Sequence, residues 1–228
     1  MHQLKNHASA LIEALFVPSD PWDFYSSPVD ELVFSLDPNG IVGEERHRRN
    51  VTFADVRSPA YQKKRDRVLN RQSVSFVSSE DLDYITDELD LDPYLLFRTE
   101  DILPDANYAQ HTIRMFLSQR LGANVLLSDF HAADDVATFR DLTPGIDFGP
   151  YDTETRKFTA ATVMLTRING PCIKPAQRIQ DEYPGEIPGL AKRFLQIAIG
   201  RRGFVGMVAR EGRMTVGQTV RFVPFGEK

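Results

Sequence analysis

Short runs of apolar and β-branched residues, each closed by a turn, recur along the chain and limit its fold more than any other feature. The expected strands cover residues 31–36, 72–77, 124–128, 158–168, 204–209 and 219–225. Helical periodicity is rarer, and the expected helices cover residues 80–89, 105–120 and 188–199. Short strands with few, scattered helices favour a mainly β protein, a barrel or sandwich with peripheral helices, over a parallel α/β sheet.

The chain divides on this basis into an N-terminal extension, residues 1–28, and one domain, residues 29–228. The stretch from Ala8 to Phe16 predicts a short amphipathic helix, which Pro18 ends. We expect the extension to lie over the β domain and not within it.

Composition excludes several kinds of partner. The net charge of −5 does not favour nucleic acid or acidic membranes. No apolar run approaches the roughly 20 residues that span a bilayer, and the N-terminus lacks the pattern of a signal peptide. The single cysteine cannot form an internal disulfide or hold an iron–sulfur cluster alone, and it indicates the reducing cytoplasm.

That cysteine, Cys172, is the first candidate for chemistry. It lies in the segment 169–175 (NGPCIKP), where a turn and two prolines predict a stiff, positioned loop. Lys174 and Arg178 would favour the thiolate, which is the form of cysteine that binds metal or carries sulfur. The alternative is a buried cysteine that acts as a small apolar residue, which is the commoner role of a free thiol.

A charged loop contains further candidates. His47 could donate to an oxyanion or act as a general acid, although a histidine in such a loop is more often only solvated. The arginines and lysines of residues 46–49 and 63–71 could bind a phosphate or pterin, and surface solvation is the alternative for most of them. The sequence contains no P-loop, no dinucleotide-binding glycine motif before a helix, no HExxH and no GxSxG.

Taken together, several of these segments resemble the MOSC domain, named for the C-terminal domain of molybdenum-cofactor sulfurase, and its stand-alone bacterial members in particular. Their order and spacing carry the likeness over residues 30–224. The segments are Gly40-Ile-Val-Gly43 through His47, Arg71 to Leu82 (RQSVSFVSSEDL), Leu121-Gly-Ala-Asn-Val125, Asn169 to Lys174, Arg201-Arg-Gly-Phe-Val205, and Gly212 with Val216-Gly-Gln218.

The resemblance implies a closed or nearly closed β-barrel that binds a molybdenum–pterin cofactor. It implies that Cys172 is the metal or sulfur ligand and a catalytic residue, together with His47. It implies cofactor contacts from Arg46, Arg71, Asn124 and Lys174. We expect His47, Arg71, Asn124 and Lys174 to converge on one cavity, which Cys172 shares. Pyridoxal phosphate binding is a further association at the level of the family.

Proteins that the chain resembles reduce N-hydroxylated compounds or mobilise sulfur. The main hypothesis is therefore an oxidoreductase acting on small N-hydroxylated molecules, with electrons from an external reductase because the chain has no nucleotide-binding motif or cluster of its own. Two alternatives stay open. The protein could carry the cofactor without turnover, or it could carry sulfur as a persulfide on Cys172 and receive it from a donor protein.

Overall fold

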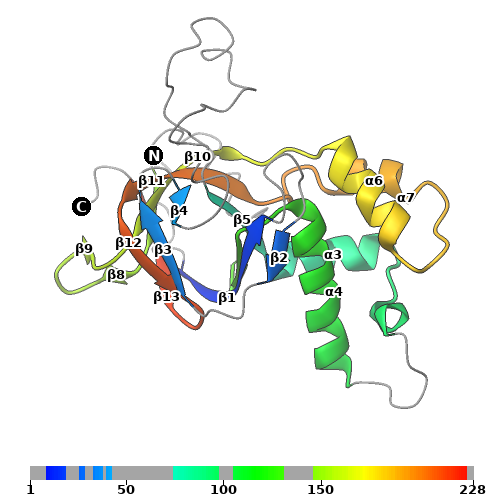
Figure 1. Ribbon diagram of the computed structural model, residues 1–228, viewed down its shortest axis with the longest axis horizontal. Coiled ribbons are helices and arrows are strands. Elements are labelled where there is room, and N and C mark those ends of the chain that lie inside the picture. Colours follow the sequence, from blue (N-terminus) through cyan, green and yellow to red (C-terminus); the bar gives the residue numbers. More distant parts are fainter. Residues whose placement is uncertain are drawn as a thin grey trace, which may run out of the picture.

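A computed structural model describes residues 9–18, 26–28, 33–37, 40–42, 74–97, 105–130 and 146–224 (Figure 1). Its strands are β1 Ser9–Pro18, β2 Ser26–Pro28, β3 Val33–Asp37, β4 Gly40–Ile41, β5 Val74–Ser78, β6 Val125–Ser128, β7 Ile146–Gly149, β8 Tyr151–Asp152, β9 Lys157–Phe158, β10 Thr162–Ile168, β11 Phe204–Arg210, β12 Gly212–Thr215 and β13 Thr219–Pro224. Its helices are α3 Ser79–Glu88, α4 Ala106–Leu121, α6 Ile173–Glu182 and α7 Leu190–Ile197, with a 3₁₀ turn, η1, at Pro93–Leu96.

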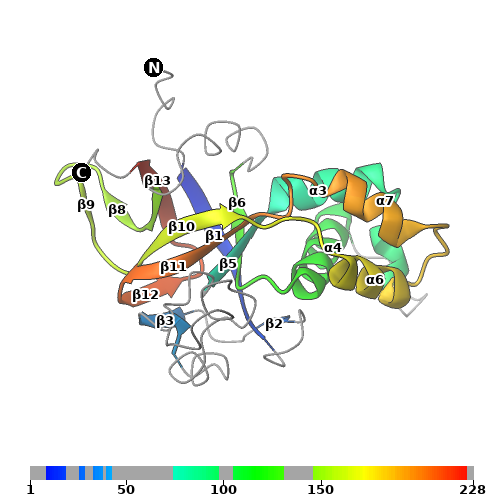
Figure 2. The same cartoon turned by 90° about the horizontal axis from the view of Figure 1, so that it is seen from above.

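Seven of the described strands close into a barrel, in the order β13-β7-β10-β11-β5-β6-β1, with β1 pairing back onto β13. Neighbours are antiparallel except β5 and β6, which are parallel. The sequence-based expectation of a closed, mainly β barrel is therefore confirmed. Figures 1 and 2 show that the four helices gather together at one side of the barrel. No helix among the described residues combines the length and the apolar character that a membrane crossing requires.

Two apolar cores stabilise the barrel and the helices beside it. The barrel interior is rich in aromatic rings, and Phe222 stacks on Phe130 with ring centres 4.3 Å apart and contacts Phe148 at 4.8 Å. A second core lies between the outer face of the barrel and the helices, where the strand residue Phe16 packs in one cluster with Ile113 and other helical side chains. Because the helices bury apolar side chains of the barrel wall, barrel and helices share one folding unit.

The helix expected from Ala8 to Phe16 is wrong, because Ser9–Pro18 form strand β1. A β-bulge shifts the register of β1 against β6 between Ile12 and Ala14. The bulge adds one residue, so Ile12 and Leu15 both face the barrel interior although they are three positions apart. A spacing of three mimics the period of a helix, which explains the wrong prediction. Residues 9–18 also form part of the barrel wall, so the expectation that they lie over the β domain is wrong as well.

The three helices expected from the sequence are confirmed as α3, α4 and α7, and their ends follow local chemistry. The Ser78 hydroxyl caps α3 by accepting from the Asp81 backbone N–H, and Gly122 ends α4 with φ of +67°. Helix α6 differs from the sequence-based prediction, in which Pro175 indicates a loop. Pro175 lies in the first turn of α6, where no backbone N–H is needed for an intrahelical bond, so the proline is tolerated there.

Candidate functional site

Cys172 lies at the N-cap of α6, with extended backbone angles of φ −137° and ψ 140°. Its carbonyl accepts from the Ala176 backbone N–H at 3.3 Å, so its main chain starts the helix. Its side chain makes no capping hydrogen bond, and the residue is half-buried. The thiol therefore lies at the positive end of a helix and makes no hydrogen bond that caps this helix.

The segment that leads to Cys172 is tied to the barrel and to α4. The Asn169 backbone N–H donates to the Gly203 carbonyl at 2.8 Å, at the start of β11. The buried Arg202 donates to the Gly170 carbonyl at 2.7 Å. On the far side of Cys172, Ala176 and Ile179 are fully buried in the helical core. The thiol is thus positioned from both directions along the chain.

A cavity of about 420 Å³ lies along the polar face of α6, beside the end of α4. The charges in it are mixed, since Glu182 pairs with Arg120 at 2.8 Å and with Arg178 at 3.3 Å. Its lining residues are Arg120, Lys174, Pro175, Gln177, Arg178, Asp181 and Glu182. The sequence-predicted contact residue Lys174 is exposed here, two residues from the thiol. Lys174 lies in the first turn of α6, where a cation and a helix N-terminus together suit an anionic group such as a phosphate.

Asn124, the second predicted contact residue within the described part, does not line this cavity. It is buried where β1, β5 and β6 meet. Its Oδ1 accepts from the backbone N–H and the hydroxyl of Ser75, both at 3.0 Å, and its Nδ2 donates to the Phe16 carbonyl at 3.3 Å. These contacts give Asn124 a role in joining strands.

We therefore expect Asn124→Ala to lower the free energy of unfolding by about 2–3 kcal/mol, because the Ser75 N–H and the Phe16 carbonyl each lose a buried partner. The alkylation rate of Cys172 in the folded mutant should equal that of the wild type. Denaturant unfolding and reaction with iodoacetamide measure the two effects. A stable mutant with an altered thiol would instead support the cofactor contact predicted from the sequence.

The remaining predicted site residues, Arg46, His47 and Arg71, lie outside the described residues. Their convergence with Cys172 stays a prediction.

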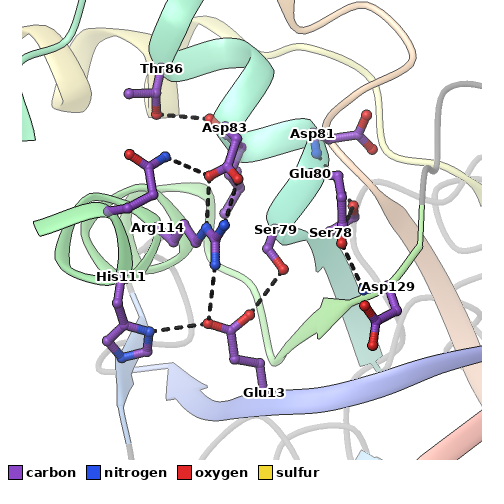
Figure 3. Close-up of polar contacts among 12 residues, drawn as sticks. Glu13, Ser78, Ser79, Glu80, Asp81, Asp83, Thr86, His111, Arg114 and Asp129 are labelled. Atoms are coloured by element: carbon purple, nitrogen blue, oxygen red, sulfur yellow. Dashed lines mark hydrogen bonds and ion pairs between the residues drawn. The ribbon is translucent and has the colours of Figure 1, made fainter. Parts of the chain in front are cut away.

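Sequence reasoning missed a polar network outside the barrel wall (Figure 3). Glu13 on β1 accepts from the Ser79 hydroxyl at 2.9 Å and lies 3.1 Å from His111 Nδ1 and 3.7 Å from Arg114. Arg114 also makes a bidentate pair with Asp83, at 2.7 and 2.5 Å, and this hydrogen bonding raises the pKa of the guanidinium. The network joins β1 to α3 and α4. Because the sequence pattern predicts a helix over residues 8–16, it gives no indication that Glu13 lies against these two helices.

The network has the character of a structural clamp. Its carboxylates are engaged with arginine, hydroxyl and imidazole groups from neighbouring elements. Within the described ranges, no three His, Cys, Asp or Glu side chains gather in a way that could hold a metal ion. Among the described residues, Cys172 remains the side chain best suited to bind a metal or to carry sulfur.

Comparisons with known proteins agree with this fold. The family model of the MOSC domain matches residues 49–221. YuaD of Bacillus subtilis (strain 168), whose name marks it as a candidate protein of metal–sulfur cluster biosynthesis, is 27% identical over 221 residues, which cover 96% of this chain and 93% of YuaD. The crystal structure of Bacillus subtilis YuaD superposes with a TM-score of 0.65 at 24% identity, over 96% of this chain and 98% of that one. A crystal structure of a hypothetical protein gives a TM-score of 0.50 at 10% identity, over 95% of this chain and 68% of that one. The two structural likenesses show the fold, and the family match over most of the chain shows that it belongs to the MOSC domain family.

Proposed function

We propose that this MOSC protein holds a molybdenum–pterin cofactor through the thiolate of Cys172 and reduces small N-hydroxylated compounds with electrons from an external reductase. The observation that carries the proposal is the position of Cys172 at the N-cap of α6. The residue is half-buried, its thiol makes no capping hydrogen bond, and other residues hold its segment in place. In this proposal the protein works in the reducing cytoplasm, where its single thiol stays reduced.

The residues around Cys172 are compatible with such a cofactor. A thiolate is a soft ligand, the kind that suits a metal bound by sulfur. The helix N-terminus and the exposed Lys174 would bind the phosphate of the pterin. Asn124 fits less well, because its amide is engaged between strands.

The chain's own contribution would be to bind, orient and shield. Cys172 would supply one ligand from a rigid position, because α6 is anchored by Ala176 and Ile179. Its partial burial would limit the access of water to the ligand atom. When bound, the cofactor would supply the redox chemistry. A single cysteine cannot hold an iron–sulfur cluster and the sequence has no nucleotide-binding motif, so the electrons would come from an external donor.

The name of YuaD favours a second candidate function, the carriage of sulfur. In this reaction the Cys172 thiolate attacks the outer sulfur of a persulfide on a donor protein. A new S–S bond forms at Cys172 while the donor's S–S bond breaks, and the donor leaves as a thiolate, so electrons balance without another oxidant. The thiol is only half-buried and makes no capping hydrogen bond at the helix end, which supports such an exchange.

Cys172→Ser tests both candidates. We expect a free energy of unfolding within about 1 kcal/mol of the wild type, because serine is nearly isosteric and the site is only half-buried. The amount of bound molybdenum, or the fraction of protein that carries one added sulfur atom, should fall to background, because an alcohol does not replace a thiolate at neutral pH.

The measurements are elemental analysis, intact-protein mass spectrometry and thermal unfolding, made on protein purified without reductant or chelator. Cys172→Ala serves as a second variant without a thiol. Lys192→Gln, at an exposed position of α7 that does not line the cavity, is a control that keeps the thiol. Molybdenum without added sulfur in the wild type supports the cofactor, and added sulfur without molybdenum supports the carrier. Retention of either by Cys172→Ser would remove Cys172 from the mechanism.

A further inference from the structure

Arg202 is a buried cation that contacts the segment leading to Cys172. The residue is only 3% exposed and directly precedes Gly203 and strand β11. Its guanidinium donates to the Gly170 carbonyl at 2.7 Å and to the Leu121 carbonyl at 3.3 Å. Because a buried guanidinium is costly unless it is hydrogen-bonded, these carbonyls have more than an incidental role.

The two carbonyls belong to the elements that flank the thiol. Leu121 is the last residue of α4, and its carbonyl lies at the negative end of that helix, which favours a cation. Gly170 lies two residues before Cys172, between β10 and α6. Arg202 thus bridges the end of α4 and the segment that leads to the thiol.

Side-chain packing contributes little to the position of this segment at Gly170. A Cβ atom built on Gly170 would meet no other atom within 4 Å. Two polar contacts restrain residues 169 and 170: the contact from Arg202 to the Gly170 carbonyl and the hydrogen bond from the Asn169 N–H to the Gly203 carbonyl. Residues 202 and 203, directly before β11, therefore help to set the path of the chain toward Cys172.

We propose that Arg202 is a positioning residue for Cys172, holding the Gly170–Cys172 segment so that the thiol stays half-buried at the N-cap of α6. The proposal deepens the function assigned above to Cys172 and rests on it. A guanidinium is suited to this role because its rigid fork can reach two carbonyls at once, which a lysine ammonium on a flexible stem does less well.

The test measures the second-order rate of Cys172 alkylation by iodoacetamide in folded protein, for wild type, Arg202→Lys and Arg202→Met. Release of the segment exposes the thiol more often. We expect an increase of about tenfold in Arg202→Met, which corresponds to the loss of the charge-assisted hydrogen bond to the Gly170 carbonyl, and a smaller increase in Arg202→Lys. Hydrogen exchange of residues 169–174 should accelerate in parallel.

Arg210→Lys is the matched control. Arg210 also donates to a backbone carbonyl, that of Phe158, but at the opposite end of β11 from Cys172. This variant should keep the wild-type alkylation rate. If Arg202→Met does not fold, Arg202→Lys carries the test through the exchange of residues 169–174, which should exceed that of both wild type and Arg210→Lys.

An unchanged or lower alkylation rate in the folded Arg202 variants, without faster exchange of residues 169–174, would overturn the positioning role. An equal increase in Arg210→Lys would overturn it too, because general loosening would then explain the rate. Failure of the proposed function has a separate signature: wild-type protein with neither molybdenum nor added sulfur. The alkylation and exchange measurements need neither, so the two failures are distinguishable.

Discussion

Deletion of residues 1–24 should abolish cooperative folding. The deletion removes β1, which closes the barrel by pairing with β6 on one side and β13 on the other. It also removes Ile12, Leu15 and Phe16, which are buried in the two apolar cores. Each such side chain contributes about 1.5–3 kcal/mol by burial, so their sum is comparable with a net stability of about 5–15 kcal/mol. Two open strand edges would remain, and such edges promote aggregation.

Far-UV circular dichroism during heating, with size-exclusion chromatography, measures this effect. Deletion of residues 1–8 is the control, because it shortens the same terminus and keeps all of β1. The control should melt cooperatively near the wild-type temperature. A cooperative transition in the longer deletion would show that the barrel forms without β1, as the sequence-based division at residue 28 implies.

Gly203→Ala should lower the free energy of unfolding by more than about 3 kcal/mol. The glycine has φ of +72°, a left-handed conformation that costs other residues about 1–2 kcal/mol. A Cβ at this position would also lie 1.8 Å from the Phe76 carbonyl oxygen. Because that oxygen belongs to β5, which pairs with β11 next to Gly203, relief of the clash would separate two strands of the barrel wall.

Gly217→Ala is a matched control for this substitution. Gly217 has φ of +80°, and a Cβ there would meet no other atom within 4 Å. It should therefore cost only the backbone strain, about 1–2 kcal/mol. Unfolding in guanidinium chloride measures both variants. Equal losses of stability would mean that backbone conformation alone, and not the approach of β5 to β11, requires glycine at residue 203.

Local patterns were sufficient for much of the fold. The alternation of Val74 and Phe76 identifies β5, since side chains on one face of a strand recur every two residues. The cap residues Ser78 and Gly122 mark helix ends, because capping depends on atoms a few positions apart. The chemical character of Cys172 could likewise be recognised from the sequence, since it is the single thiol of the chain.

The sequence by itself thus determined the mainly β class, three of the four described helices and the residue at the centre of the proposed chemistry, because each depends on neighbours along the chain. Only the tertiary structure decided that residues 9–18 form a barrel strand, since the bulge against β6 disguises its period. The same holds for the partners of Asn124 and Arg202, which lie between 32 and 108 positions away along the chain. A hydrogen bond to a backbone carbonyl depends on where the folded chain brings that carbonyl, and nearly any residue type can supply it, so sequence pattern carries no record of the partner.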